Sequence, residues 1–347
     1  MPVPPPGHHR VDCARAGRRR RVTDGGSKLR PAGRGGTRAG LTSGRRHRRD
    51  PDAAPRRRAI RPERAVRRND RGRRVPPRRL GGLAGAGLPA AGAGPFPALL
   101  EVHGGAWNAN DRTQNASLDE ALAASGLVVV AIDFRLGTQT PYPASIADVN
   151  YATRWLKARA GDFNATAEVL GGLGLSSGGH MVMLSAMRPR DPRYAALPLD
   201  ATMGTSDSGA DASLAYVMMG WPVLDPLARY RYARDLGRTN LVESHDRYFG
   251  DEATMDEANP QRILERGEAV ELPPALLFQG AADDVLSPRT AERFVEAYGR
   301  AGGIIELALY PGAGHGYARE LGPNTTRTIA LLKSFVARQL AAIDQES

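Results

Sequence analysis

The chain has 347 residues, a formal net charge of +11 and a single cysteine, Cys13. A single cysteine excludes an intramolecular disulfide, and no apolar run approaches the ~18 residues that a membrane-spanning helix needs, so no membrane span is expected. The charge is divided unevenly: residues 1–94 carry 26 Lys and Arg against 6 Asp and Glu, whereas acidic residues outnumber basic ones in the rest of the chain.

Residues 1–94 are rich in Arg, Gly, Pro and Ala and contain few aromatic or β-branched residues. Such a composition cannot bury enough apolar surface to offset the entropy of ordering, so we expect this segment to be disordered. It fits a solvated charge run, a basic arm that binds nucleic acid nonspecifically, or an out-of-frame translation upstream of the true gene. In the last case the folded domain begins near Pro95 and lacks its first strands. Because aromatic residues are not interleaved with the arginines, no specific nucleic-acid partner is expected.

A twin-arginine export signal is the alternative to a cytoplasmic location. Arg78 and Arg79 precede Leu80 and a Gly/Ala-rich run that extends to Gly94. The run is only weakly apolar and lies far from the first residue of the chain. The sequence therefore favours a cytoplasmic protein over an exported one.

From Pro95 onward, short apolar runs alternate with segments of helical periodicity. The predicted strands are Phe96–Val102, Leu127–Asp133, the apolar run before Ser176, Leu214–Met219, Pro274–Gln279 and Ile304–Tyr310. The predicted helices are Asn115–Ser125, Ser145–Arg159, the segment after Gly178, Pro288–Gly299 and Thr325–Ile343. Residues 226–262 are richer in charge and aromatics and are expected to form inserted helices, with residues 227–257 acting as a lid.

This alternation predicts the α/β fold class: a mostly parallel sheet with helices on both faces and a small helical lid insertion. The predicted catalytic domain spans residues 95–347. A parallel sheet of this kind places its chemistry at the carboxyl ends of the strands, so polar and glycine-rich clusters at those ends are the candidate functional residues.

The first such cluster is Gly174-Leu-Ser176-Ser-Gly178, which lies between an apolar run and a segment of helical character. This is where a sharp strand-to-helix turn presents a nucleophilic serine. A nucleophile held in a strained conformation leaves little room for a Cβ two residues before or after it, and the two glycines fit that requirement. Ser176 is therefore the predicted nucleophile.

A second cluster predicts the backbone donors that assist the serine. His103-Gly104-Gly105 follows the first strand of this region, and its glycines allow backbone N–H groups to turn toward a developing oxyanion. The predicted donors are the N–H groups of Gly104, Gly105 and Ser177, the residue after the nucleophile.

An acid and a base are predicted from the loops after the last two strands. Asp283 and Asp284 follow the strand that ends near Gln279, with Asp283 the first choice and Asp284 the alternative. His315 lies between glycines after the last strand, on a loop where a packed core histidine is not expected. Ser176, Asp283 and His315 therefore form the predicted catalytic set.

Several other residues have weaker assignments. Trp107, Trp221 and Tyr317 lie near strand ends and are predicted to line an acyl or alcohol pocket, although core packing explains them as well. His180 is expected to pack or form hydrogen bonds, and His245 to lie at the surface. No clustered His/Cys set predicts a metal site, and no cofactor is expected.

With these motifs, residues 95–343 resemble the α/β-hydrolase superfamily, and within it carboxylesterases with a His-Gly-Gly oxyanion motif. The segments Asp133–Leu136, Pro141–Ala144 and Asp148–Trp155 are similar to those of the hormone-sensitive-lipase group. The string Gly-Leu-Ser-Ser-Gly-Gly-His is more like the feruloyl and acetyl-xylan esterases and their prolyl-oligopeptidase-like relatives. The order Ser176, Asp283, His315 is that of the superfamily's triad.

The resemblance implies a serine hydrolase that cleaves small to medium carboxylic esters through an acyl-enzyme, with a small-molecule ester as its partner. An amidase, formamidase or peptidase-like hydrolase is the near alternative, because the same triad serves these reactions. The alternative from another class is a noncatalytic binding protein with a basic arm.

Overall fold

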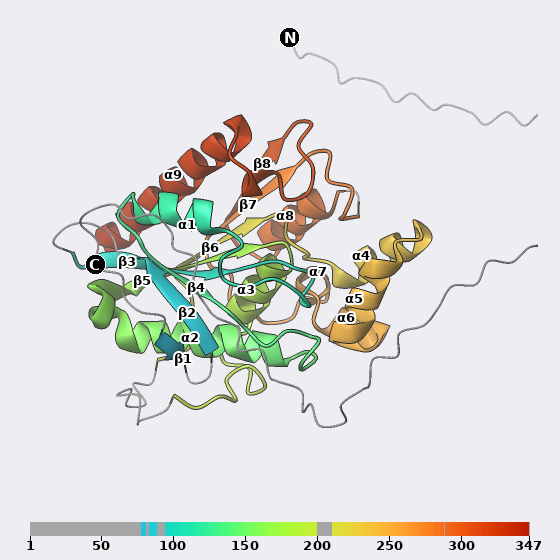
Figure 1. Cartoon of the computed structure of the whole chain (residues 1–347), viewed down its shortest axis with the longest axis horizontal. Coiled ribbons are helices and arrows are strands. Elements are labelled where there is room, and N and C mark those ends of the chain that lie inside the picture. Colours follow the sequence, from blue (N-terminus) through green and yellow to red (C-terminus); the bar gives the residue numbers. More distant parts are fainter. Residues whose placement is uncertain (1–77, 81–82, 89–93, 200–209, 288, 347) are drawn as a thin grey trace, which may run out of the picture. The chain divides into compact units, whose positions relative to one another are not determined.

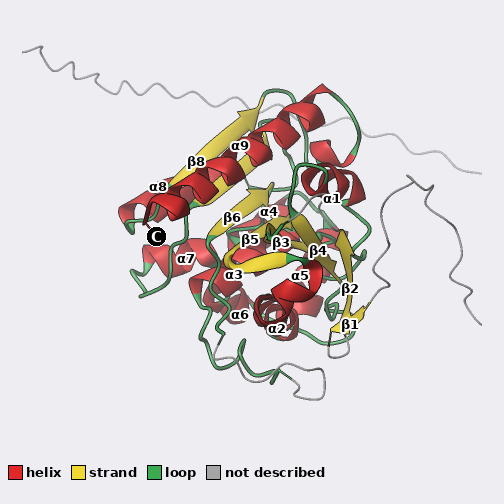
Figure 2. Ribbon diagram, turned by 90° about the vertical axis from the view of Figure 1, so that its left-hand side faces the viewer, coloured by secondary structure: helices red, strands yellow, loops and turns green. Residues whose placement is uncertain are grey.

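The computed structural model describes residues 78–80, 83–88, 94–199, 210–287 and 289–346. The predictions for residues 1–77, disorder and out-of-frame origin included, lie outside the described residues. The described residues form a sheet with helices on both faces, as the sequence predicts (Figures 1 and 2).

The sheet has eight strands in the order β1-β2-β4-β3-β5-β6-β7-β8 among the described residues. Neighbouring strands from β4 through β3 to β8 are parallel, whereas β1 and β2 are antiparallel to their neighbours. The strands are β1 (Arg78–Leu80), β2 (Leu83–Leu88), β3 (Phe96–Val102), β4 (Val128–Ile132), β5 (Ala165–Leu175), β6 (Tyr216–Gly220), β7 (Ala275–Gly280) and β8 (Ile305–Tyr310).

Two strands of the sheet, β1 and β2, precede the predicted domain start at residue 95, so the first strands that the out-of-frame alternative would remove are present in the sheet. β2 pairs with β4 in a register that sets Gly85 opposite Ile132 and Leu88 opposite Val129, and β1 continues the sheet beyond β2. The sequence of β2, Leu-Ala-Gly-Ala-Gly-Leu, lacks the β-branched and aromatic residues that identify strands. Its pairing comes from backbone hydrogen bonds to β4, which such a sequence pattern does not reveal.

Side chains that alternate along the strands form two apolar layers. Leu99, Val129 and Phe278 face one layer, which α1 (Ala116–Ala123) and α9 (Pro323–Glu346) cover. Leu100 and Val130 face the other layer, which α2 (Ala144–Arg159), α3 (Ser177–Met187) and α8 (Thr290–Arg300) cover (Figure 2). Full burial of each such side chain contributes about 1.5–3 kcal/mol relative to exposure, which makes these layers the main source of stability.

The predicted helical insertion between β6 and β7 is present. It comprises α4 (Pro226–Asp235), α5 (Thr239–Phe249), α6 (Glu252–Glu257) and α7 (Pro260–Glu265), and α4, α5 and α6 gather at one side of the sheet in Figure 1. The side chains of Asp225, Asp251 and Asn259 accept backbone N–H groups at the starts of α4, α6 and α7. These caps satisfy first-turn donors and fix where each short helix begins.

An ion pair ties the loop after β4 to α2. The Arg135 guanidinium contacts both carboxylate oxygens of the buried Asp148, and the Arg135 backbone N–H donates to the same carboxylate at 2.8 Å. This contact explains why the Asp-Phe-Arg-Leu segment and the start of α2 form one motif. Within the described ranges, every helix is too short or too polar to span a bilayer.

Candidate active site

Ser176 stands at a sharp turn between β5 and α3. Its backbone has φ 56° and ψ −118°, a region that residues other than glycine rarely adopt, and its N–H donates to Gly220 O at 2.8 Å. A Cβ at Gly174 would lie 2.4 Å from Gly178 O, so the turn closes backbone against backbone. The predicted strand-to-helix elbow is therefore present, with Ser176 at its apex.

The structure brings Ser176, His315 and Asp283 together at the carboxyl ends of β5, β8 and β7. Ser176 Oγ lies 3.0 Å from His315 Nε2, and His315 Nδ1 lies 2.8 Å from Asp283 Oδ2. Asp283 Oδ1 accepts the N–H of Val285 at 2.9 Å, which holds the carboxylate in place. A neutral imidazole with its proton on Nδ1 can donate to Asp283 and accept the Ser176 hydroxyl proton on Nε2.

The two neighbouring aspartates have different surroundings. The Asp283 side chain is 0% exposed and contacts His315, whereas the Asp284 side chain is 70% exposed and pairs with Arg238 at 2.7 Å. Arg238 lowers the pKa of Asp284 through its hydrogen bond and charge. Of the two candidates, only Asp283 has the geometry of a histidine partner.

The loop that follows β3 lies beside the nucleophile. The N–H of Trp107 donates to Ser177 Oγ at 3.1 Å, and His103 Nδ1 donates to Gly104 O at 2.7 Å while its ring stacks on Phe134. These contacts fix the loop's approach to Ser176.

The three predicted oxyanion donors differ in their availability. The Gly104 N–H already donates to Gln114 Oε1 at 2.9 Å, which the sequence does not reveal. Ser177 begins α3, so its N–H has no acceptor within the helix, and Gly105 is the next residue of the loop. Of the three predicted donors, the Ser177 N–H is therefore available and the Gly104 N–H is occupied, whereas Gly105 stays a prediction.

The predicted pocket residues divide into two groups. Trp107 and Trp221 are fully buried, which corrects the expectation that they line an accessible pocket. Trp107 stacks on Tyr248 of α5 at a centroid distance of 5.1 Å, and Trp221 packs edge-on against Phe278 and His315. Tyr317 is partly buried. Its hydroxyl oxygen lies 3.0 Å from Thr328 Oγ1, at hydrogen-bond distance, and its ring packs against Trp221. The two tryptophans thus support the site from beneath.

Two buried histidines, His180 and His245, contact Trp107 of the loop that follows β3. His180 Nδ1 accepts the Trp107 indole N–H at 3.1 Å and its Nε2 donates to Ala258 O at 2.8 Å, as expected of a hydrogen-bonding residue. His245 is buried against Trp107, so its predicted surface position is wrong. Burial lowers the pKa of His180 to about 4 and that of His245 to about 3, which keeps both rings neutral at pH 7.

Two arginines near the site have no signal in the sequence. Arg229 of α4 is buried over the Trp107 ring, and its Nε and Nη1 have no hydrogen-bond partner among the described residues. Burial lowers its pKa to about 10, partly offset by the charge of Asp283. Arg319 follows His315 in the same connection and reaches the oxyanion loop. Neither arginine belongs to a motif of fixed spacing, so the sequence alone does not identify Arg229 or Arg319 as a residue of the site.

Comparison with known proteins places the fold and the family. Residues 87–298 match the BD-FAE family. Esterase LipC of Mycobacterium tuberculosis is 32% identical over 263 residues, which cover 73% of this chain and 61% of LipC, so the chain spans less than two thirds of that relative.

Two solved esterases share the fold. The propionate-bound esterase Est2 of Thermogutta terrifontis aligns with a TM-score of 0.57 and 24% identity, over 74% of this chain and 89% of that one. Esterase B of Lactobacillus rhamnosis aligns with a TM-score of 0.63 and 20% identity, over 76% and 82%. Because the family match covers more than half of the chain and includes the elbow, this protein belongs to the BD-FAE family within the α/β-hydrolase superfamily.

Proposed function

We propose that this protein is a serine esterase that cleaves small to medium carboxylic esters through an acyl-enzyme. The observation that carries the proposal is the chain of contacts from Ser176 Oγ through His315 to Asp283. A hydroxyl, an imidazole and a buried carboxylate in this order are the groups that acyl transfer requires.

In the first half of the reaction, Ser176 Oγ attacks the ester carbonyl carbon as His315 Nε2 accepts the hydroxyl proton. Asp283 holds the Nδ1–H and stabilises the imidazolium that forms. The tetrahedral intermediate collapses when its bond to the alcohol oxygen breaks, and His315 returns the proton to that oxygen. The products of this half are the free alcohol and an acylated Ser176.

Water completes the cycle. The oxygen of a water molecule attacks the acyl carbon as His315 Nε2 accepts a proton from that water. The tetrahedral intermediate then collapses, His315 returns the proton to Ser176 Oγ, and the carboxylic acid is released. The N–H groups of Ser177 and Gly105 stabilise both tetrahedral oxyanions, and one such donor contributes about 3 kcal/mol in comparable sites. Gly104 joins them only if its N–H leaves Gln114.

Ester cleavage is favoured over amide cleavage because LipC, which shares 32% identity, is named an esterase. The amidase, formamidase and peptidase-like alternatives use the same residues and differ in the leaving group. The noncatalytic alternative depends on the basic segment, most of which lies outside the described residues.

A paired substitution tests the proposal. The wild type is expected to hydrolyse 4-nitrophenyl butyrate, and Ser176→Ala is expected to lower kcat by about 10⁴-fold or more. Ser185→Ala makes the same chemical change at another buried position of α3 and serves as the control. Equal rates for wild type and Ser176→Ala would remove the esterase assignment. A 4-nitroanilide and an N-formyl amide of matched acyl length distinguish the amidase alternative.

We further propose that the insertion over residues 227–257 acts as a lid. Its α5 contacts the oxyanion loop directly, because Asn108 Nδ2 donates to Ser244 O at 2.9 Å and Trp107 stacks on Tyr248. Phosphonylation of Ser176, in which Oγ bonds to the phosphorus of a phosphonate ester and the 4-nitrophenolate group leaves, is expected to slow amide hydrogen exchange in α4 and α5. Unchanged exchange in those helices would contradict a lid.

The cytoplasmic location is also a proposal, with export as its alternative. Residues 78–94, which resemble a twin-arginine signal, include both strands that extend the sheet beyond β4. Cleavage of such a signal would remove β1 and β2, and the sheet would then end at β4. Cell fractionation with a carboxyl-terminal tag distinguishes the two locations.

A further inference from the structure

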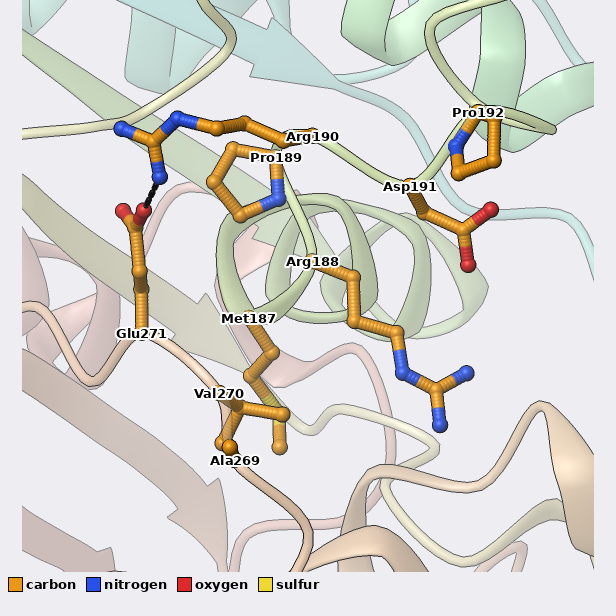
Figure 3. Close-up of a pocket in the computed structure, with 9 residues that line it drawn as sticks. All are labelled: Met187, Arg188, Pro189, Arg190, Asp191, Pro192, Ala269, Val270 and Glu271. Atoms are coloured by element: carbon orange, nitrogen blue, oxygen red, sulfur yellow. Dashed lines mark hydrogen bonds and ion pairs between the residues drawn. The ribbon is translucent and has the colours of Figure 1, made fainter.

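Among the described residues, charged side chains lie around a hollow at the end of α3 and beside the catalytic set, and these two places differ in whether the arginines there have acidic partners. A hollow of about 480 Å³ lies at the end of α3, and Figure 3 shows Arg188, Arg190, Asp191 and Glu271 around it. Arg190 pairs with Glu271 and Asp211, Arg188 with Glu257 and Glu268, and Asp191 with Arg193. These charges are neutralised within the protein, so the hollow has no need of a charged ligand.

Arg319 is placed differently, at the end of the short 3₁₀ helix Tyr317–Arg319 that follows His315. Its position can be fixed from Gly104 in the oxyanion loop. A Cβ at Gly104 would lie 3.1 Å from Ser176 Cβ and 3.4 Å from Arg319 Nη2. The guanidinium and the nucleophilic side chain therefore border the same small volume.

Two further contacts orient this guanidinium. Its Nη1 would lie 3.1 Å from a Cβ at Gly316, the residue after His315, and its central carbon lies 6.0 Å from the centre of the Trp221 ring. An arginine over an indole face is held by cation–π attraction, which leaves the edge of the fork free to donate hydrogen bonds.

No carboxylate forms an ion pair with Arg319 among the described residues. The two acids of the adjacent loop have other partners, because Asp283 contacts His315 and Asp284 pairs with Arg238. The surrounding protein lowers the pKa of Arg319 by partial desolvation, yet a guanidinium remains protonated at pH 7. The Arg319 side chain is exposed beside the site, so its positive charge faces solvent and has no acid of its own among the described residues.

We infer that Arg319 is a specificity determinant that binds a carboxylate on the substrate, so that the enzyme favours esters carrying a negative charge near the scissile carbonyl. The inference rests on the proposed esterase function and names its substrate class. A carboxylate accepts two parallel hydrogen bonds from an arginine fork, and this geometry orients as well as attracts the ligand. The charge can belong to the acyl or to the alcohol portion, and the chemistry of recognition is the same.

Two matched substrate pairs test this inference. For the acyl portion, 4-nitrophenyl hydrogen glutarate is compared with 4-nitrophenyl valerate. For the alcohol portion, 4-acetoxybenzoate is compared with its methyl ester. The measured quantity is the ratio of kcat/KM for the charged member to that for the neutral member, in wild type, Arg319→Gln and Arg319→Lys.

In at least one pair, Arg319→Gln is expected to lower this ratio about 10- to 100-fold, mainly through KM of the charged ester. Arg319→Lys keeps the charge but loses the planar fork, so an intermediate ratio is expected. Arg238→Gln removes a neighbouring cation that is already paired with Asp284, and its ratio is expected to match wild type.

Failure of the Arg319 inference and failure of the proposed esterase function give different results in these assays. If wild type hydrolyses the neutral esters and Arg319→Gln leaves both ratios unchanged, the inference is overturned and the esterase function stands. An equal fall of the ratio in Arg238→Gln would also overturn it, because general electrostatics would then explain the preference. If wild type hydrolyses none of the four esters, the esterase function fails and the inference fails with it.

Discussion

Gly178 lies against Val102 so closely that a Cβ at position 178 would be 2.0 Å from the Val102 carbonyl oxygen. The same atom would lie 2.6 Å from His103 O. The first turn of α3 therefore packs directly on the end of β3, where the oxyanion loop begins. This contact couples the position of Ser176 to the position of the loop that faces it.

Gly178→Ala is expected to destabilise the protein by about 3 kcal/mol or more, because neither backbone can retreat from the added methyl group. The loss is measured as a lower Tm and a lower urea midpoint, and activity is expected to fall with it. Gly161→Ala is the control, since a Cβ there meets no atom within 4 Å. A Gly178→Ala variant as stable as Gly161→Ala would show that the close approach is absent.

Asp283→Asn and Asp284→Asn are expected to have very different effects on catalysis. Loss of the buried acceptor for His315 Nδ1 leaves the imidazole in the wrong tautomer, and kcat is expected to fall about 10⁴-fold. Asp284 contacts Arg238 instead, so its substitution is expected to change kcat by less than about 10-fold. Steady-state kinetics on 4-nitrophenyl butyrate measures both. Equal losses in the two variants would contradict the assignment of Asp283.

Local motifs explain most of what the sequence predicts well. The elbow at Ser176, the loop at His103 and the turn at His315 are each set by a few neighbouring glycines, and each follows an apolar strand. Such features depend on short-range sterics and on strand ends that meet at one edge of the sheet, so a single sequence is enough to identify them.

Contacts between distant residues explain what the sequence does not predict. β2 depends on backbone pairing with β4, and the burial of His245 depends on how α5 packs over Trp107. The hydrogen bond from the Gly104 N–H to Gln114 Oε1 joins residues that are close in sequence, yet it is equally hard to predict. A glutamine in a loop belongs to no sequence pattern that identifies it as an acceptor. These details are set by packing, and composition or periodicity does not encode them.

Gln114→Leu is expected to lower kcat about 10-fold, with a smaller change in KM. Gln114 Oε1 accepts the Gly104 N–H, and its loss frees the loop that carries the proposed oxyanion donor Gly105. One hydrogen bond is worth about 1 kcal/mol, and a 10-fold change corresponds to about 1.4 kcal/mol. Gln114→Glu keeps an acceptor oxygen and is expected to retain more activity. A rise of kcat in Gln114→Leu would instead mean that the freed Gly104 N–H serves as an oxyanion donor.

Asp119→Asn is expected to change the pH dependence of stability. Asp119 of α1 and Glu101 of β3 are both buried, and Asn115 Nδ2 donates to Glu101 Oε1 at 2.7 Å. Burial, followed by the charge of Glu120, raises the pKa of Asp119 from 3.8 to about 8, and burial with the charge of Asp119 raises the pKa of Glu101. The folded protein therefore holds a proton on Asp119 at pH 6 that the unfolded chain has lost.

The sign of the effect follows from proton uptake. Where the folded state binds more protons than the unfolded state, the free energy of unfolding falls as pH rises, here between about pH 4 and the folded pKa of about 8. The slope is at most about 1.4 kcal/mol per pH unit for one group. The Asn side chain of the Asp119→Asn variant cannot ionise, so the stability of this variant relative to wild type is expected to increase from pH 5 to pH 8 in urea titrations.

Glu296→Gln is the control. It removes an exposed carboxyl of α8 and is expected to show a constant difference from wild type. A constant difference for Asp119→Asn as well would place its ionisation outside this window, because the buried histidines titrate alike in both proteins and cancel from the difference.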